Sequence, residues 1–529
     1  MISTNDTRAA THVQGPSAPP QTPMLLIRCN NFVSVADAAG GPTPQSVASV
    51  LHGYLGYQYK QFLRGLAQID PITGKRRSII IDRKSLYKLD QLGRVTTYAG
   101  FIPRIASVLS EKCGCAVSLV DLTPPPTRPD WNTPVWENLA GVNFRYRQEE
   151  LLQHVVTAER GIFNCSMGFG KSFLFGAISR LFSHARIAIV VPGRATAASV
   201  YRDLLQFVGL PGRVDGSHRD IQRVTVYSPD SLHHFDDDAD IMLVDEVDKC
   251  LATTLREKLF AAATRVRKLF AFSGTPYARL DGTAACLEAV FGQELMRVTN
   301  NELVNNGSVT AIHVHWLPIS LPSNPIAQYK SSHKRVQMGI WRNVGRNAQI
   351  ANFVRTHYGD PDVQVLISVA TVDHALHLWQ HLPEFHMAYA GKDYNYFEKS
   401  DFVRLLPPSF QPLSRKAGQT LAEGFAAGTI KKVIATDIWS TGCNFPQLQV
   451  LVRADARESE GLNLQWAARP NRLYENKHMA VMVDCVDFWD SGYCRKSNTR
   501  YRQYKQQGHT QTWPDRNTLL QVGHNADSV

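Results

Sequence analysis

Short apolar runs and segments of helical periodicity alternate along most of the chain. Between residues 136 and 310, apolar runs such as Ile187–Val191 and Ile241–Val244 are separated by stretches in which apolar residues recur at helical spacing. A second series of the same kind extends from 311 to 490. Strands that alternate with helices in this way are typical of parallel sheets covered by helices on both faces. The pattern therefore predicts an α/β fold with two tandem domains.

The two ends of the chain have a different pattern. Residues 1–23 are rich in Pro, Ser and Thr, which predicts a flexible tail. Residues 24–122 combine short apolar stretches with a helical pattern at Ile102–Leu109, as expected for a small α+β domain. The proline-rich segment 123–135 is predicted to be a stiff linker, and residues 491–529 are predicted to form a basic C-terminal extension.

Composition excludes several classes of protein. The chain has 529 residues, of which 44% are hydrophobic and 19% charged, so it can form several buried cores and is too hydrophobic for general disorder. No apolar run approaches the roughly 18 residues of a membrane-spanning helix, and the N-terminus lacks the pattern of a signal peptide. The nine cysteines are scattered without paired CxxC motifs, as in proteins of a reducing compartment. We therefore expect a cytoplasmic protein with no membrane contact.

The distribution of charge indicates a polyanionic partner. The chain has 57 Lys and Arg against 46 Asp and Glu, a net charge of +11. Residues 51–100 alone hold nine basic and three acidic side chains, a net charge of +6. Within them, Lys75, Arg76 and Arg77 follow the turn at 70–74, which predicts a hairpin with positive charge near its tip. These three residues are candidates for DNA binding, and a solvated basic surface is the alternative interpretation.

A glycine-rich loop, Cys165-Ser-Met-Gly-Phe-Gly-Lys-Ser172, lies between a predicted strand and a predicted helix. Small residues such as Gly168 and Gly170 allow backbone N–H groups to approach a phosphate, and the start of the helix adds a positive potential. Lys171 is expected to contact the β- and γ-phosphates of a nucleotide, and Ser172 is expected to bind Mg²⁺. The general pattern has Gly where this chain has Cys165.

Three carboxylates follow the apolar run Ile241–Val244. Ligands of parallel sheets bind at the carboxyl ends of the strands, where these side chains are expected. Asp245 is the candidate Mg²⁺ ligand, and Glu246 is the candidate general base for an attacking water. An acidic strand end without function is the alternative, but a phosphate loop earlier in the same domain makes it less favoured.

These two segments resemble motifs I and II of the superfamily 2 helicases, with Asp245–Asp248 as the DExD/H box. Further segments match other motifs of the family in order: Phe144–Gln148, Val191–Arg194, Ser228–Ser231, Ser273–Thr275, Val365–Ser368, Ala435–Gly442 and Gln465–Arg472. The resemblance implies two RecA-like domains, ATP hydrolysis that drives a helicase cycle, and ATP and Mg²⁺ as cofactors. It also implies that Gln148 lies on the adenine side of the nucleotide.

The resemblance assigns roles to residues of the other motifs. Those implied to contact the DNA backbone are Pro192, Arg194, Ser228 and Thr436. Those implied to couple hydrolysis to nucleic-acid binding are Asp248, Ser273, Thr275, Asp437 and Gly442.

Gln465, Arg469 and Arg472 are spaced i, i+4 and i+7, which predicts that they project from one face of a helix. Side chains placed in this way can reach across a cleft together. The two guanidinium groups would neutralise charge that develops on the γ-phosphate, and all three residues are candidate catalytic residues. Ala468 replaces the usual glycine of the family, and Asn444 stands where many relatives have Asp.

The layout of the whole chain resembles the phage UvsW-type helicases, in which a small basic domain precedes the RecA-like pair. The closing segments Val483–Asp487 and Lys496–Arg500 strengthen this resemblance. It implies remodelling of branched DNA, such as forks, Holliday-type junctions and R-loops, in phage replication, recombination or repair, within the host cytoplasm. It is compatible with a monomer or a weak oligomer. An RNA helicase, a restriction-type translocase subunit and a non-catalytic nucleic-acid-binding scaffold are the alternatives.

Overall fold

The computed structural model describes residues 22–62, 68–69, 76–77, 79–126, 128–236, 238–279, 281–389, 415–440, 443–475 and 477–513. It divides into two compact units, which meet in sequence between Pro125 and Pro126. Both residues lie within the proline-rich segment 123–135. None of the helices in the described ranges is long and apolar enough to cross a membrane.

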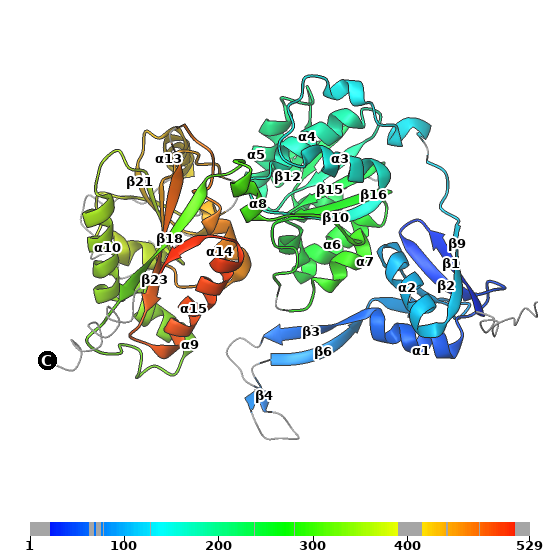
Figure 1. The fold of residues 1–529 in the computed structure, drawn as a ribbon, viewed down its shortest axis with the longest axis horizontal. Helices are drawn as coiled ribbons and strands as arrows, with labels where there is room; N and C mark the ends of the chain where they lie inside the picture. The colour runs from blue at the N-terminus through cyan, green and yellow to red at the C-terminus, as the bar shows by residue number, and fades with distance from the viewer. Residues whose placement is uncertain are drawn as a thin grey trace, which may run out of the picture. The chain divides into compact units, whose positions relative to one another are not determined.

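The first unit contains a mixed sheet and two helices (Figure 1). The sheet has the order β7-β8-β2-β1-β9, with β1 and β9 parallel and the other neighbours antiparallel. Its strands are β1 (Thr22–Cys29), β2 (Phe32–Asp37), β7 (Tyr87–Leu89), β8 (Val95–Tyr98) and β9 (Cys115–Asp121), and its helices are α1 (Gln45–Tyr54) and α2 (Ile102–Cys113). Gly114 ends α2 with a φ of 62°, a left-handed conformation that glycine adopts readily. This is the α+β architecture predicted for the segment.

Two antiparallel strand pairs in the same unit form a ribbon apart from that sheet. One pair is β3 (Gly56–Phe62) with β6 (Ile79–Ser85), and the other is β4 (Gln68–Ile69) with β5 (Arg76–Arg77). Ile69 pairs with Arg76, and the predicted turn at 70–74 lies outside the described residues. Lys75 lies outside the described residues, and only the backbone of Arg76 and Arg77 is described.

The second unit begins with a predominantly parallel sheet of order β13-β12-β14-β11-β15-β16-β10-β17, in which only β12 and β13 are antiparallel. The strands are β10 (Arg160–Cys165), β11 (Ile187–Val190), β12 (Gly212–Asp215), β13 (His218–Asp220), β14 (Val224–Tyr227), β15 (Ile241–Asp245), β16 (Lys268–Ser273) and β17 (Glu294–Val298). The helices are α3 (Gln148–Thr157), α4 (Lys171–Leu181), α5 (Arg194–Leu204), α6 (Thr253–Ala263), α7 (Ala285–Phe291) and α8 (Asn300–Asn305). Every residue of β11, β14 and β15 is buried, as expected for strands covered on both faces.

The C-terminal half of the predicted linker belongs to this domain. Trp131 is buried in its core, and the Arg128 guanidinium forms an ion pair with Asp240 at 2.8 Å. Residues 129–132 form a short 3₁₀ helix.

A second parallel sheet follows, with the order β20-β21-β19-β22-β23-β18-β24. Its strands are β18 (Ala311–Ile319), β19 (Val365–Ser368), β20 (His386–Ala388), β21 (Lys432–Ala435), β22 (Val450–Arg453), β23 (Met479–Asp487) and β24 (Thr510–Thr512). Its helices are α9 (Ser332–Val336), α10 (Val344–Tyr358), α11 (Val372–Trp379), α13 (Arg415–Ala427), α14 (Glu460–Ala467) and α15 (Ser491–Gln506). The two parallel sheets confirm the predicted pair of tandem α/β domains.

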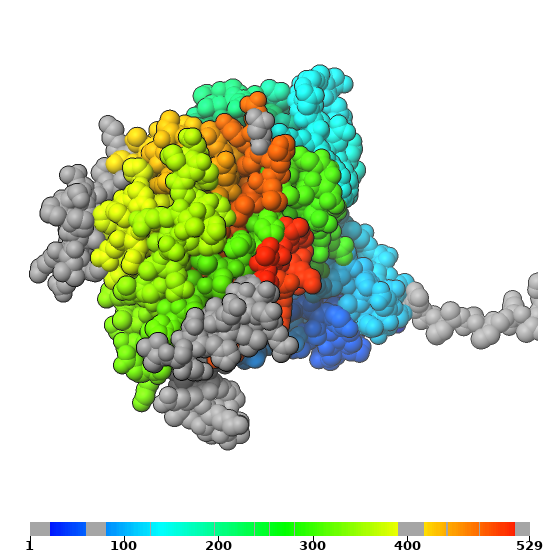
Figure 2. Space-filling view, turned by 60° about the vertical axis from the view of Figure 1, so that its left-hand side comes forward, coloured from blue at the N-terminus to red at the C-terminus, as the bar shows by residue number. Residues whose placement is uncertain are grey.

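The start of the predicted C-terminal extension is part of the second domain and does not stand outside it. Strand β24 pairs with β18, and α15, red in Figure 2, packs against β23. Tyr504 is fully buried, and the buried Arg500 guanidinium forms an ion pair with Asp484 at 2.9 Å. The positive charge of Arg500 is therefore neutralised by a buried carboxylate within the second domain.

Candidate active site

The phosphate loop lies where the sequence predicts it. Strand β10 ends at Cys165, and helix α4 begins at Lys171. Gly168 and Gly170 have φ values of 94° and 93°, a region that residues with a Cβ rarely adopt. A Cβ on Gly170 would lie 2.7 Å from Nε2 of Gln148, so both backbone conformation and close packing require glycine there.

The Gln148 side chain forms a hydrogen bond with the backbone of this loop. Its Nε2 donates a hydrogen bond to the Phe169 carbonyl at 2.7 Å, and its Oε1 accepts one from the Arg145 backbone N–H at 2.8 Å. Because its side chain is buried at the first turn of α3, it restrains the shape of the loop. Its expected contact with adenine stays a prediction.

Lys171 forms ion pairs with both acidic residues at the end of β15. Its Nζ lies 3.0 Å from Asp245 Oδ1 and 2.5 Å from Glu246 Oε1. Burial by itself would lower the pKa of Lys171, but the two carboxylates outweigh it and raise the pKa, so the lysine is charged. Burial is also the largest influence on the carboxyl groups. It raises the pKa of Asp245, whereas Lys171 outweighs it at Glu246 and lowers the pKa there.

Glu246 has a strained backbone. Its φ and ψ are 45° and 50°, in the left-handed region, and it precedes the 3₁₀ helix Val247–Leu251. For a residue with a Cβ this conformation costs about 1–2 kcal/mol, and such strain is concentrated at functional sites. The turn directs the Glu246 carboxylate toward Lys171 instead of continuing the strand.

Both α/β domains line a cavity of about 280 Å³ next to this loop. From the first domain it is lined by Lys171, Ser172, Asp245 and Glu246, and from the second by Arg469 and Arg472. Most of the residues predicted to bind ATP and Mg²⁺ or to act in catalysis therefore face one space. Ser172 and Asp245 supply the hydroxyl and carboxylate oxygens that suit Mg²⁺.

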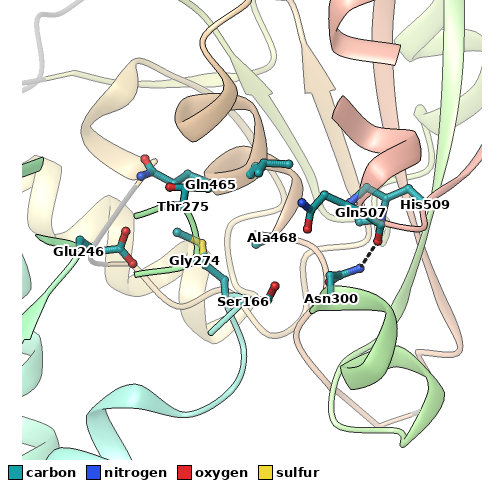
Figure 3. Close-up of a pocket in the computed structure, with 11 residues that line it drawn as sticks. Ser166, Glu246, Gly274, Thr275, Asn300, Gln465, Ala468, Gln507 and His509 are labelled. Atoms are coloured by element: carbon teal, nitrogen blue, oxygen red, sulfur yellow. Dashed lines mark hydrogen bonds between the residues drawn. The ribbon is translucent and has the colours of Figure 1, made fainter. Parts of the chain in front are cut away.

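The predicted helical face of Gln465, Arg469 and Arg472 is wrong. Helix α14 ends at Ala467, before either arginine. The physical reason is Pro470, because a proline disfavours the helical conformation of the residue before it. The arginines still reach the cavity, but they do so from the turn after the helix. Gln465 instead lines a second cavity with Glu246 and Thr275 (Figure 3).

Arg469 is held by backbone carbonyls of the segment after β21. Its Nε donates to the Ser440 carbonyl at 3.0 Å, and its terminal nitrogens donate to the carbonyls of Ser440 and Cys443. Burial lowers the pKa of Arg469 to about 10, and the cation is retained at neutral pH. Burial also lowers the pKa of Arg472.

Three of the predicted coupling residues form one hydrogen-bonded group. The Ser273 hydroxyl donates to Asp248 Oδ1 at 2.6 Å, and the Thr275 backbone N–H donates to the same hydroxyl at 3.0 Å. Asp437 is not part of this group, because its carboxylate accepts hydrogen bonds from Arg457, one of them at 2.7 Å. Gly442 lies outside the described residues.

The residues predicted to contact DNA are placed less uniformly. Arg194 is exposed at the start of α5, whereas Pro192 lines the 280 Å³ cavity. Ser228 is buried, and its hydroxyl donates to the Ser231 hydroxyl at 3.0 Å. Thr436 is also buried, with its backbone N–H bonded to the Ala388 carbonyl at 3.0 Å. Ser228 and Thr436 directly follow β14 and β21, and their contact with DNA stays a prediction.

Sequence reasoning missed Asp203, which projects from α5 into the same cavity. Burial raises the pKa of Asp203, and a hydrogen bond from Ser172 counteracts that effect. Cys443 and Asn444 also line the cavity. The position of Asp203 depends on how α5 docks on α4, for which the sequence contains no local signal.

Two tandem parallel sheets carry a phosphate loop after β10, acidic residues after β15, and arginines of the second domain at one cavity. This is the arrangement that the sequence predicts for two tandem RecA-like domains. No protein-family model and no curated protein matches the chain.

Solved structures that are similar to the chain include the following three. The crystal structure of T4 UvsW is 14% identical with a TM-score of 0.38, and the match covers 93% of this chain and 98% of that one. S. cerevisiae Dbp5 bound to RNA and ADP BeF3 is 13% identical with a TM-score of 0.49, and the match covers 71% of this chain and 92% of that one. The ATP-dependent type ISP restriction-modification enzyme LlaBIII bound to DNA is 13% identical with a TM-score of 0.47, and the match covers 73% of this chain and 32% of that one.

Replacing Gly168 by Ala is expected to weaken ATP binding by about tenfold or more, a loss of roughly 1.4 kcal/mol. A Cβ at this position would lie 2.4 Å from Val309 Cγ1, and the φ of 94° is unfavourable for alanine. Titration with a fluorescent ATP analogue measures the effect. Gly209→Ala is the matched control, since no atom lies within 4 Å of its added Cβ. Equal affinity in the two variants would contradict the close packing of the loop.

Proposed function

We propose that this protein is a nucleic-acid-dependent ATPase and helicase that translocates on DNA. The observation that carries the proposal is the single cavity that joins Lys171 and Glu246 of the first domain to Arg469 and Arg472 of the second. An ATP hydrolase that couples turnover to domain movement needs groups from both domains at the terminal phosphate.

The residues of the first domain suggest how hydrolysis begins. When a nucleotide enters, Lys171 exchanges its contacts with Asp245 and Glu246 for phosphate oxygens. That exchange frees the Glu246 carboxylate from Lys171, which holds its pKa low, and the carboxylate can then accept a proton from the attacking water. Ser172 and Asp245 would hold Mg²⁺, which would neutralise charge on the phosphates when it is bound.

The second domain contributes two guanidinium groups to the same phosphate. Both arginines line the cavity, and Arg469 also donates hydrogen bonds to the backbone carbonyls of Ser440 and Cys443. Charge on the γ-phosphate attracts both groups as it develops. Closure of the domains around ATP, followed by opening after hydrolysis, moves the pair along a strand.

DNA with branches is the substrate that we infer. The net charge of +11 favours a polyanion, and basic residues are concentrated at 51–100 within the first unit. The layout of a small basic domain before a RecA-like pair, which resembles the UvsW-type helicases, favours forks, Holliday-type junctions and R-loops over uniform duplex.

Forked and four-way DNA are expected to stimulate ATP turnover more than single-stranded or duplex DNA, and more than RNA of matched sequence. Phosphate contacts dominate such binding, so affinity should fall steeply as salt is raised. The measurement is steady-state ATPase activity with each nucleic acid in turn. Preferential stimulation by RNA would identify an RNA helicase instead, and the absence of stimulation by any nucleic acid would contradict the proposed function.

Deleting residues 1–125 tests the division of labour between the two units. The cut follows the boundary between them and leaves the buried Trp131 with its domain. ATPase activity stimulated by single-stranded DNA should be retained, while branch processing should be lost.

A further inference from the structure

The segment that joins the two α/β domains lies between the phosphate loop and the arginines. It runs from the end of α8 at Asn305 to the start of β18 at Ala311. Its last two residues, Val309 and Thr310, are both only 4% exposed. A linker that merely tethers two domains has no need of such burial, since connecting segments normally lie on the surface.

Val309 packs against the phosphate loop. Its Cγ1 lies 2.4 Å from the position that a Cβ on Gly168 would take, so nothing larger than a hydrogen atom separates the two residues. Val309 also belongs to the core of the first domain, together with Phe169 and Leu303. This end of the connection is fixed to the loop that receives the phosphates.

Thr310 is fixed to the arginine-bearing turn of the second domain. Its backbone N–H donates to the Asn471 carbonyl at 2.7 Å, and its hydroxyl donates to the Arg472 carbonyl at 3.1 Å. Arg472 lies in the turn after α14, where no helix restrains its backbone. These two hydrogen bonds restrain that backbone, and Arg472 Nη1 consequently lies 3.9 Å from the same Cβ position on Gly168.

We propose that Thr310 is a positioning residue for Arg472, and that the connection sets the separation between the arginine and the phosphate loop. This inference rests on the proposed ATPase function. Consecutive Cα atoms are about 3.8 Å apart. Val309, which packs on the phosphate loop, and Thr310, which is bonded to the arginine-bearing turn, are therefore held at that separation. A domain movement that shifts one of these residues acts directly on the other.

Thr310→Val removes the hydroxyl and keeps the shape of the side chain and the backbone N–H. The turnover number for ATP is expected to fall by about tenfold, the size of one lost hydrogen bond that orients a catalytic group. The KM for ATP should change by less than about twofold, because Lys171 and the loop remain in place. Thr310→Ser, which retains the hydroxyl, should restore turnover. Thr310→Ala provides a second variant without the hydroxyl, should valine disturb folding.

Thr157→Val is the matched control. The Thr157 hydroxyl also donates to a backbone carbonyl, that of Gln153 at 2.9 Å, but it does so on the exposed face of α3. This variant should turn over ATP at the rate of the unaltered protein.

A double-mutant cycle with Arg472→Ala decides whether Thr310 acts through the arginine. If it does, Thr310→Val should have no further effect on turnover in the Arg472→Ala background. Independent, multiplying effects would overturn the inference, as would full turnover by Thr310→Val when Arg472→Ala is inactive. Full turnover by Arg472→Ala itself would show that the proposed role of Arg472 in hydrolysis has failed, and the inference with it.

Discussion

Glu246→Gln is expected to slow ATP hydrolysis by about 10²- to 10⁴-fold, the usual contribution of a general base. The amide cannot accept the proton of the attacking water. ATP binding should persist, because the loop glycines, Lys171 and Ser172 are unchanged, and loss of one carboxylate frees Lys171 from its 2.5 Å contact. Single-turnover hydrolysis and nucleotide titration together separate the two effects.

The control for this variant is Glu257→Gln, an exposed carboxylate on α6 of the same domain. It removes one negative charge without touching the cavity and should hydrolyse ATP normally. Glu246→Gln with normal turnover would remove Glu246 from the reaction. A loss of ATP binding equal to the loss of turnover would indicate instead that Glu246 serves to shape the site.

Asp487→Ala is expected to destabilise the second domain by about 3–5 kcal/mol, the cost of leaving one charge of a buried ion pair unpaired. Asp487 accepts hydrogen bonds from Arg346 at 2.7 and 3.2 Å, and both side chains are completely buried. Burial opposes the charge of Arg346, but Asp487 outweighs this effect and raises the pKa, so the guanidinium has no neutral form available. Hydrogen exchange of the backbone amides in β22 and β23 measures the effect.

An exposed ion pair in the same domain provides the comparison. Arg355 Nε lies 2.9 Å from Glu384 Oε1, with side chains 51% and 45% exposed. Glu384→Ala should therefore cost no more than about 1 kcal/mol. Equal protection losses in the two variants would contradict the assignment of Asp487 to a buried, structurally required pair.

Local pattern predicts much of this fold. The run Ile241–Val244 becomes the buried strand β15, and the helix expected after the glycine loop is α4. Such elements follow from the sequence because a strand covered on both faces must be apolar throughout. The phosphate loop is equally predictable, since the φ values of Gly168 and Gly170 demand residues without a Cβ.

Other features depend on tertiary contacts. The position of Arg472 follows from Pro470, which ends α14, and from hydrogen bonds to Thr310, a residue far away in sequence. The burial of Ser228 depends on its neighbours after β14. The inclusion of Arg500 in the second domain depends on Asp484 of β23. None of these pairings has a local signature, so periodicity and motif spacing alone do not identify them.

The proposed ATPase mechanism requires that both α/β domains bind the same terminal phosphate. The most direct measurement is a crystal structure with ADP, BeF3 and Mg²⁺ bound. We expect the BeF3 group within hydrogen-bonding distance of Lys171 Nζ and of the Arg472 guanidinium, with Lys171 released from Glu246. A BeF3 group held by Lys171 with both Arg469 and Arg472 out of hydrogen-bonding reach would contradict a shared phosphate site.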